Sequence, residues 1–150
     1  MRASLLLSLA FALTAQIACA ATMSVQNAWI PAPPPGATTA VAYGKLINGG
    51  PTSDRFTGAH SPVAGSMEIH QMSTAGGVMR MRPVHGGIAM GAGAAVRIAP
   101  GGYHLMLIGL KRPLKAGDHV KIVLEFERDA PLDVDFPVKP AASAGGMGGM

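Results

Sequence analysis

The pattern that decides the fold lies at residues 100–110, with the sequence Pro100-Gly101-Gly102-Tyr103-His104-Leu105-Met106-Leu107-Ile108-Gly109-Leu110. A Gly-Gly turn opens this stretch and an apolar run follows, which predicts a β-strand that begins at a tight turn. Side chains two residues apart on a strand point to the same face, so His104 and Met106 are expected to project side by side. Imidazole and thioether together suit copper, reduced copper in particular. The stretch therefore predicts a strand that carries either two metal ligands or two further core residues.

Short strands separated by glycine and proline are expected on both sides of this stretch. Alternation of apolar and polar residues is clearest at residues 78–82 and 119–126. Pro100-Gly101-Gly102 is expected to be the turn of a hairpin, and Lys115-Ala116-Gly117-Asp118 a second turn. The predicted strands are 25–30, 38–47, 54–59, 66–71, 78–82, 94–98, 103–107, 119–126 and 132–138. No window shows a long helical stripe, so the pattern predicts an all-β sandwich or barrel.

The N-terminal segment has the pattern of a secretory signal peptide. Arg2 precedes an apolar run at residues 5–13, and Ala18-Cys19-Ala20 is a small-x-small cleavage site. The run is too short to span a bilayer, which takes roughly 20 apolar residues. We therefore expect residues 1–20 to be a signal peptide and the protein to be exported without stable membrane insertion. A lipoprotein modified at Cys19 is the less favoured alternative, because Gln16 stands where that site normally has a leucine-like residue.

The expected mature chain consists of one domain, residues 21–139, and a Gly/Met tail, residues 140–150, that we expect to be disordered. Cys19 is the only cysteine, so the mature chain would have no disulfide, no cysteine nucleophile and no thiolate ligand. Methionine is then the only sulfur ligand left. The net charge is +4, and the basic residues form neither a long run nor an aromatic-interleaved patch, which argues against a nucleic-acid partner.

Possible histidine and methionine ligands are grouped at three places. Two are His-x-Met pairs, His70-Gln71-Met72 and His104-Leu105-Met106, and one is a Met-x-Met pair, Met79-Arg80-Met81. A single methionine is more often a core filler, and a single histidine is more often a surface residue. A turn at Gly76-Gly77 would return the second group to the first, whereas the position of the third group does not follow from the pattern.

Three segments of the chain resemble the periplasmic copper chaperone family called PCu(A)C. They are Met67-Glu68-Ile69-His70, residues 77–84 (GVMRMRPV) and residues 100–118 (PGGYHLMLIGLKRPLKAGD), and the resemblance extends from about Ala28-Trp29 to Val138. It implies a cupredoxin-like Greek-key β-sandwich that binds one Cu(I) ion through two histidines and two methionines. By position, the implied ligands are His70, Met81, His104 and Met106.

The family motif does not require two neighbouring methionines, Met72 and Met79. We expect Met79 to be a core residue or to lie just outside the ligand set, and the role of Met72 stays open. In the tail, Met147 and Met150 leave weak Cu(I) capture open, but the lack of histidine there argues against a Cu(II) site. His60 and His85 are expected to be surface residues.

The resemblance implies a periplasmic metallochaperone that delivers Cu(I) to the Cu(A) centre of cytochrome c oxidase. Its implied partners are the Cu(A)-containing subunit and a Sco-type thiol protein, and we expect a monomer. A blue-copper electron carrier would need a cysteine thiolate, which the mature chain lacks. The nearest alternative is a periplasmic copper buffer or resistance protein without a dedicated acceptor, and a copper-free interaction sandwich is a third. We do not expect an enzyme, because no Ser-His-Asp spacing is present and the carboxylates lie mostly near turns or in the last strands.

Overall fold

The structure is a computed structural model and describes residues 22–142. The described residues are all-β and have a cupredoxin-like fold, as predicted. The expected signal peptide and residues 143–150 of the expected tail lie outside the described residues. The strands are β1 (Met23–Pro31), β2 (Thr39–Asn48), β3 (Asp54–His60), β4 (Ala64–Ala75), β5 (Val78–Pro83), β6 (Ile88–Met90), β7 (Ala95–Ile98), β8 (Tyr103–Leu110), β9 (His119–Phe126) and β10 (Leu132–Lys139).

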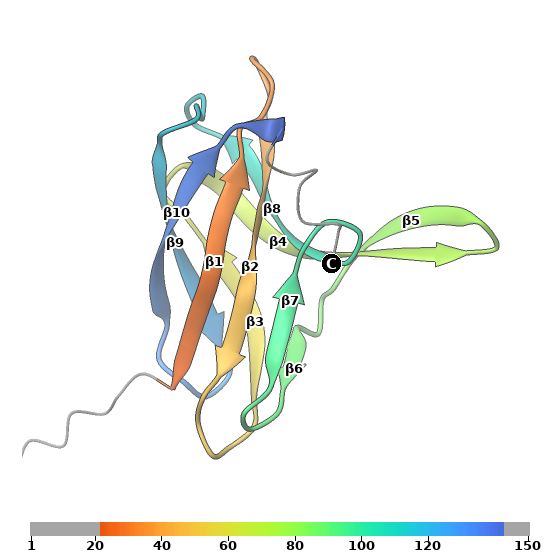
Figure 1. Cartoon of the computed structure of the whole chain (residues 1–150), viewed down its shortest axis with the longest axis vertical. Coiled ribbons are helices and arrows are strands. Elements are labelled where there is room, and N and C mark those ends of the chain that lie inside the picture. The colour runs from red at the N-terminus through yellow and green to blue at the C-terminus, as the bar shows by residue number, and fades with distance from the viewer. Residues whose placement is uncertain (1–21, 143–150) are drawn as a thin grey trace, which may run out of the picture.

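The strands form one continuous hydrogen-bonded sheet in the order β5-β4-β8-β7-β2-β1-β10-β9-β3-β6. The sheet folds over on itself, so that the layer with β9 and β10 packs against the layer with β1, β2 and β8 (Figure 1). A register shift between Gln26 and Trp29 bends β1, and Asn27 within it has φ 52. The last residues of β1 can then pair in parallel with β10, at Ile30 opposite Val138. This bulge joins the two layers.

The core lies between these layers and is built by strict alternation. On β8, Leu105 and Leu107 are almost fully buried in the apolar core. Ile122 and Leu124 of β9 belong to the same core cluster. Since alternate residues point to opposite faces, His104 and Met106 lie on the face of β8 away from this core, as predicted.

The predicted hairpin between residues 94–98 and 103–107 is wrong. Strands β7 and β8 both run antiparallel to β2, β7 along residues 44–47 and β8 along residues 39–42. The two strands therefore run in the same direction, and they meet each other only at Ile98 opposite Tyr103. The glycines between them do form a turn, in which the Gly102 N–H donates to the Ala99 carbonyl. The two segments pair along consecutive parts of β2 instead of with each other, so the chain runs in the same direction before and after the turn.

Two further differences concern the edges of the sheet. Strand β6 was not predicted, because three residues are too few to show alternation. Strand β4 continues to Ala75, beyond the predicted end at Gln71, and pairs there with β5. The turn between them is Gly76-Gly77, with φ 61 and 76, the type I′ geometry that needs positive φ at both positions.

The β4–β5 hairpin leaves the body of the sandwich as an arm, seen projecting from it in Figure 1. Residues 64–71 of β4 pair with β8, and residues 70–75 pair with β5. His70 lies where the two pairings overlap, so it has His104 opposite it on one side and Pro83 on the other. The root of the arm thus carries the first predicted ligand.

A buried carboxylate, Asp54, ties the start of β3 to the loop after β9. Its oxygens accept the backbone N–H groups of Arg55, Arg128 and Asp129 at 2.7, 3.0 and 2.9 Å. Burial alone would raise the pKa of Asp54, but the three hydrogen bonds favour the ionised form, and with the charge of Arg128 they lower the pKa below its ordinary value.

We predict that Asp54→Ala lowers the free energy of unfolding at pH 7 by about 2 kcal/mol, because three N–H groups lose a charged acceptor. The wild-type advantage is complete above the unfolded-state pKa near 4, and it disappears as the pH falls through the lowered folded-state pKa. Urea unfolding at pH 7 and at pH 3 measures both effects. Asp133→Ala, at an exposed carboxylate 3.7 Å from Lys121, is the control and should change little at either pH. An equal loss for Asp54→Ala at both pH values would contradict the assignment.

Candidate metal centre

The four predicted ligands lie on one face of three adjacent strands. In the β4–β8 ladder, His70 is opposite His104, and Met106 is opposite Glu68. In the β4–β5 ladder, Met81 is opposite Met72. Directly opposite residues, and residues two apart on one strand, share a face. The topology therefore brings His70, Met81, His104 and Met106 to the root of the arm.

Two contacts bring three of the four side chains together. The His70 Nδ1 atom lies 3.2 Å from the Met81 Sδ atom. The imidazole rings of His70 and His104 are edge-on, with centroids 5.5 Å apart and planes at 79°. Met106 is placed by register beside His104, on the same face of β8. The arrangement has two imidazoles and one thioether in contact, with a second thioether next to them.

Exposure increases across the group from β8 toward the arm. His104 is 5% exposed, whereas Met81 is 50% exposed. The His70 side chain, at 13%, lies between them. The group is thus closed where it meets the body and open where it meets the arm.

The pKa of His104 is lowered from its ordinary value. Burial is the main cause, because it disfavours the charged ring. A hydrogen bond to the backbone of Gly102 opposes this shift, and the nearby His70 adds to it. His104 is therefore neutral at pH 7, the form in which a ring nitrogen can donate a lone pair to a metal.

Glu68 is a member of the group that the sequence argument missed. Its Oε2 atom lies 2.8 Å from His70 Nε2, and its side chain is half exposed. The carboxylates had been expected to be solvated side chains near turns or in the last strands. The signal was available in the spacing, since residues 68 and 70 of one strand share a face.

The neighbouring methionines do not behave as core residues. Met72 is directly opposite Met81, and Met79 is 61% exposed on the arm. Of the two places expected for Met79, the core is wrong, because all six residues of β5 are exposed and no other described strand packs over them. A place just outside the ligand set stays a prediction.

The other histidines lie apart from this group. His60 and His119 each meet one exposed carboxylate, Glu125 at 2.8 Å and Asp135 at 2.6 Å. His85 is an exposed residue after β5. Within residues 22–142, histidines and carboxylates alone form no cluster of three or more side chains that could hold a metal ion. A site in this part of the chain therefore depends on methionine sulfur.

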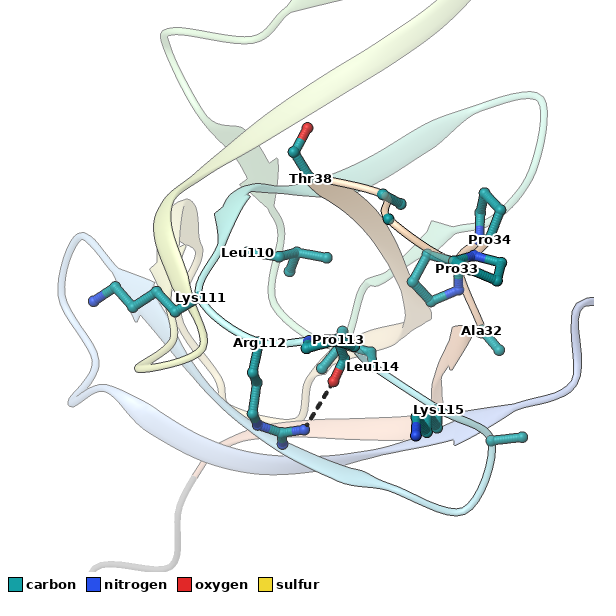
Figure 2. A pocket seen from close by; sticks show the side chains of 14 residues that line it. Ala32, Pro33, Pro34, Thr38, Leu110, Lys111, Arg112, Pro113, Leu114 and Lys115 are labelled. Carbon is teal, nitrogen blue, oxygen red and sulfur yellow. Dashed lines mark hydrogen bonds between the residues drawn. The ribbon is translucent and has the colours of Figure 1, made fainter.

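A separate groove of about 680 Å³ lies at the other end of β8. It is formed by the proline-rich segment after β1 and the segment after β8, and Figure 2 shows Leu110 and Leu114 among its apolar lining with Lys111 and Lys115 beside them. Its fourteen lining residues include no histidine, methionine or carboxylate. This groove is not part of the His/Met group.

No helix long and apolar enough to cross a bilayer occurs in the part of the chain that the structure describes.

Comparison with known proteins identifies the family. A family model described as "Putative lipoprotein LpqE-like" matches residues 23–138. The protein "Putative lipoprotein Lxx21020" of Leifsonia xyli subsp. xyli (strain CTCB07) is 35% identical over 122 residues, which cover 81% of this chain and 72% of that protein.

Solved structures agree with this match. Apo-DR1885 from Deinococcus radiodurans is 30% identical, with a TM-score of 0.62, and the match covers 93% of this chain and 97% of that one. The structure titled CuI-DR1885 is 32% identical over 83% of this chain and 85% of its own, with a TM-score of 0.59. The copper-bound PCuAC domain from PmoF2, 24% identical over 79% of this chain and 93% of its own at a TM-score of 0.67, supports the fold. The chain therefore belongs to the LpqE-like family, which is the PCu(A)C family that its motifs resemble.

Proposed function

We propose that this protein is a periplasmic Cu(I) metallochaperone that carries one ion between His70, Met81, His104 and Met106. The observation that carries the proposal is the 3.2 Å contact between His70 Nδ1 and Met81 Sδ, beside the ring of His104. All four donors are neutral, and the two soft thioethers favour Cu(I) over harder ions, while the two imidazoles also suit copper. A relative 32% identical to this chain, DR1885, has a structure titled as its CuI form.

The donor set favours transport of copper in one oxidation state over electron transfer. A blue-copper site uses a cysteine thiolate, and the only cysteine of this chain is Cys19, before the domain. Neutral ligands also leave the bound ion with its single positive charge. Departure of the ion then needs no proton to neutralise a ligand, only an incoming donor.

The exposure gradient supports release by stepwise exchange. Met81 is half exposed on the arm, so an acceptor's ligand can replace it first, while the buried His104 still holds the ion. We propose the Cu(A)-containing subunit of cytochrome c oxidase as the acceptor, reached directly or alongside a Sco-type protein. The alternative is a copper buffer or resistance protein that uses the same group without a dedicated acceptor.

Glu68 would orient His70 for this role. A carboxylate can only accept a hydrogen bond, so its 2.8 Å contact places the proton of the neutral imidazole on Nε2. The Nδ1 lone pair is then directed toward Met81 Sδ, at the position where a metal ion would bind both atoms. Carboxylate–histidine pairs of this kind fix the tautomer of metal-binding histidines in proteins generally.

We predict that a competition titration of the purified protein with the Cu(I) chelator bicinchoninate gives one tightly bound ion, held by the four proposed ligands. His104→Ala and Met81→Leu should each weaken that binding, His104→Ala by at least about 100-fold, since losing a ligand costs more than losing an outer partner. Met67→Leu is the matched control, because it removes a thioether from the opposite face of β4 and should bind like the wild type. Equal affinity of His104→Ala and wild type would refute the proposed site.

A transfer assay separates the chaperone from the buffer. We predict that the Cu(I)-loaded protein, mixed with an apo Cu(A) domain, delivers both copper ions, and that adding ferricyanide, which removes one electron from the filled centre, then produces the absorption of mixed-valence Cu(A). The Met81→Ala variant, loaded at excess copper, tests whether the exposed ligand governs the rate of copper transfer to the Cu(A) domain. Retention of all copper by the loaded protein would favour the buffer.

We also predict that Glu68→Ala changes the tautomer of His70. Side-chain ¹⁵N spectra of the apo protein above pH 7.5 should show mainly Nε2-protonated His70 in the wild type and a mixture in the variant, with Cu(I) affinity reduced by about tenfold. Glu125→Ala is the control, because it removes the equivalent partner of His60 and should leave the signals of His70 unchanged. Unchanged ¹⁵N shifts of His70 in Glu68→Ala would exclude this role of Glu68.

A further inference from the structure

We infer that three methionines of the β4–β5 arm, the half-buried Met72 and the exposed Met79 and Met81, form a capture site that takes up Cu(I) before the four-ligand group holds it. This inference rests on the proposed copper function and extends it, since Met72 and Met79 are outside the ligand set that the motif implies. Three observations support it: the exposure of the arm, the register of its two strands, and the sulfur of Met81, which belongs to both groups.

The first step is the unusual exposure of the arm. Its large apolar side chains stand in solvent, with Val78 54%, Met79 61% and Met81 50% exposed. Methionine usually fills gaps in a core, but β5 is exposed along its whole length and has no core to fill. Exposing these apolar side chains to water costs free energy. A soft cation that arrives from solvent and binds the exposed thioethers would explain why they are there.

The second step is the register, which places the three thioethers on one face. Met72 is directly opposite Met81, and Met79 is opposite Thr74, two residues farther along β4. Opposite residues have Cβ atoms about 4.5–5.5 Å apart, and diagonal neighbours lie about 7–8 Å apart. Unbranched side chains with three rotatable bonds can bring their sulfur atoms together across these spacings. Arg80 and Arg82 alternate with these methionines on β5 and point to the other face.

The third step is that Met81 belongs to both groups. Its sulfur lies 3.2 Å from His70 Nδ1, at the root of the arm. An ion held by the three methionines can stay on Met81 while its bonds to Met72 and Met79 break and bonds to His70, His104 and Met106 form. Copper remains Cu(I) throughout, every ligand is neutral, and neither an electron nor a proton is transferred.

The face of the arm therefore forms a path of soft donors from solvent to the buried His104. Capture on the arm raises the effective concentration of the ion at the histidines and makes the second step intramolecular. The prediction is kinetic: removing Met72 and Met79 should slow loading more than it weakens the final complex.

Silver(I), a redox-inert substitute for Cu(I), tests the capture site directly. The purified protein with ¹³C-labelled methionine methyl groups is titrated with Ag(I), in the wild type and in His70→Ala/His104→Ala. In His70→Ala/His104→Ala we expect the methyl signals of Met72, Met79 and Met81 to shift and that of Met106 to shift far less, whereas the first equivalent of Ag(I) in the wild type should end on the four-ligand group and shift mainly Met81 and Met106. Shifts of Met81 and Met106 in the wild type without shifts of Met72 and Met79 in the double variant would overturn the capture site but leave the proposed function intact. No shift at any of the four methionines would overturn both.

Loading kinetics keep the inference testable if the double histidine variant does not fold. Transfer of Cu(I) from a bicinchoninate complex is followed by the loss of its colour in a stopped-flow instrument. Met72→Leu/Met79→Leu should load about tenfold more slowly than the wild type, with an equilibrium affinity within about threefold. Met67→Leu/Met90→Leu removes two thioethers outside the arm, one fully buried in the core and one packed against it, and is the matched control. Equal loading rates for the wild type and Met72→Leu/Met79→Leu would refute the capture site.

Discussion

The alternation of side chains along β8 is the constraint on which the candidate site depends. Leu105 and Leu107 are held in the core between the two layers, which forces His104 and Met106 onto the opposite face. A slip of one residue would exchange the two sets and bury the polar ring among leucines, so the register is strongly specified. The adjacent strand β4 then brings His70 opposite His104. The geometry of the metal group is thus a consequence of how the core is packed.

The same strand pairing gives the two ends of the group different properties. His104 is surrounded by the body of the protein and is nearly inaccessible. Met81 is on β5, an edge strand whose only pairing among the described residues is with β4. Interactions supported by a packed core open less readily than those at an exposed edge. A carrier needs both properties, because one end of the site must retain the ion while the other exchanges ligands. Glu68 contacts His70 at the boundary between these two regions.

Much of the strand pattern was predictable, because strands with clean alternation and glycine turns carry local signals. The Gly76-Gly77 hairpin formed as expected, and so did the division of β8 into a core face and a His/Met face. The predicted hairpin around Gly101-Gly102 failed because local turn chemistry does not reveal that β2 accepts both β7 and β8. Strand β6 was too short to show a period, and the exposure of Met79 depends on the absence of a packed layer over β5.

The sequence by itself determined the chemistry available to this protein. A domain segment without cysteine, two His-x-Met pairs, one Met-x-Met pair and alternating strands place neutral nitrogen and sulfur donors on one face of a sheet. Only the tertiary structure decided which donors meet, because pairing between β4 and β8 joins residues more than thirty positions apart and leaves no local period. It also decided the burial of His104 and the contact between Glu68 and His70, since both depend on what packs around a side chain and not on the residue itself.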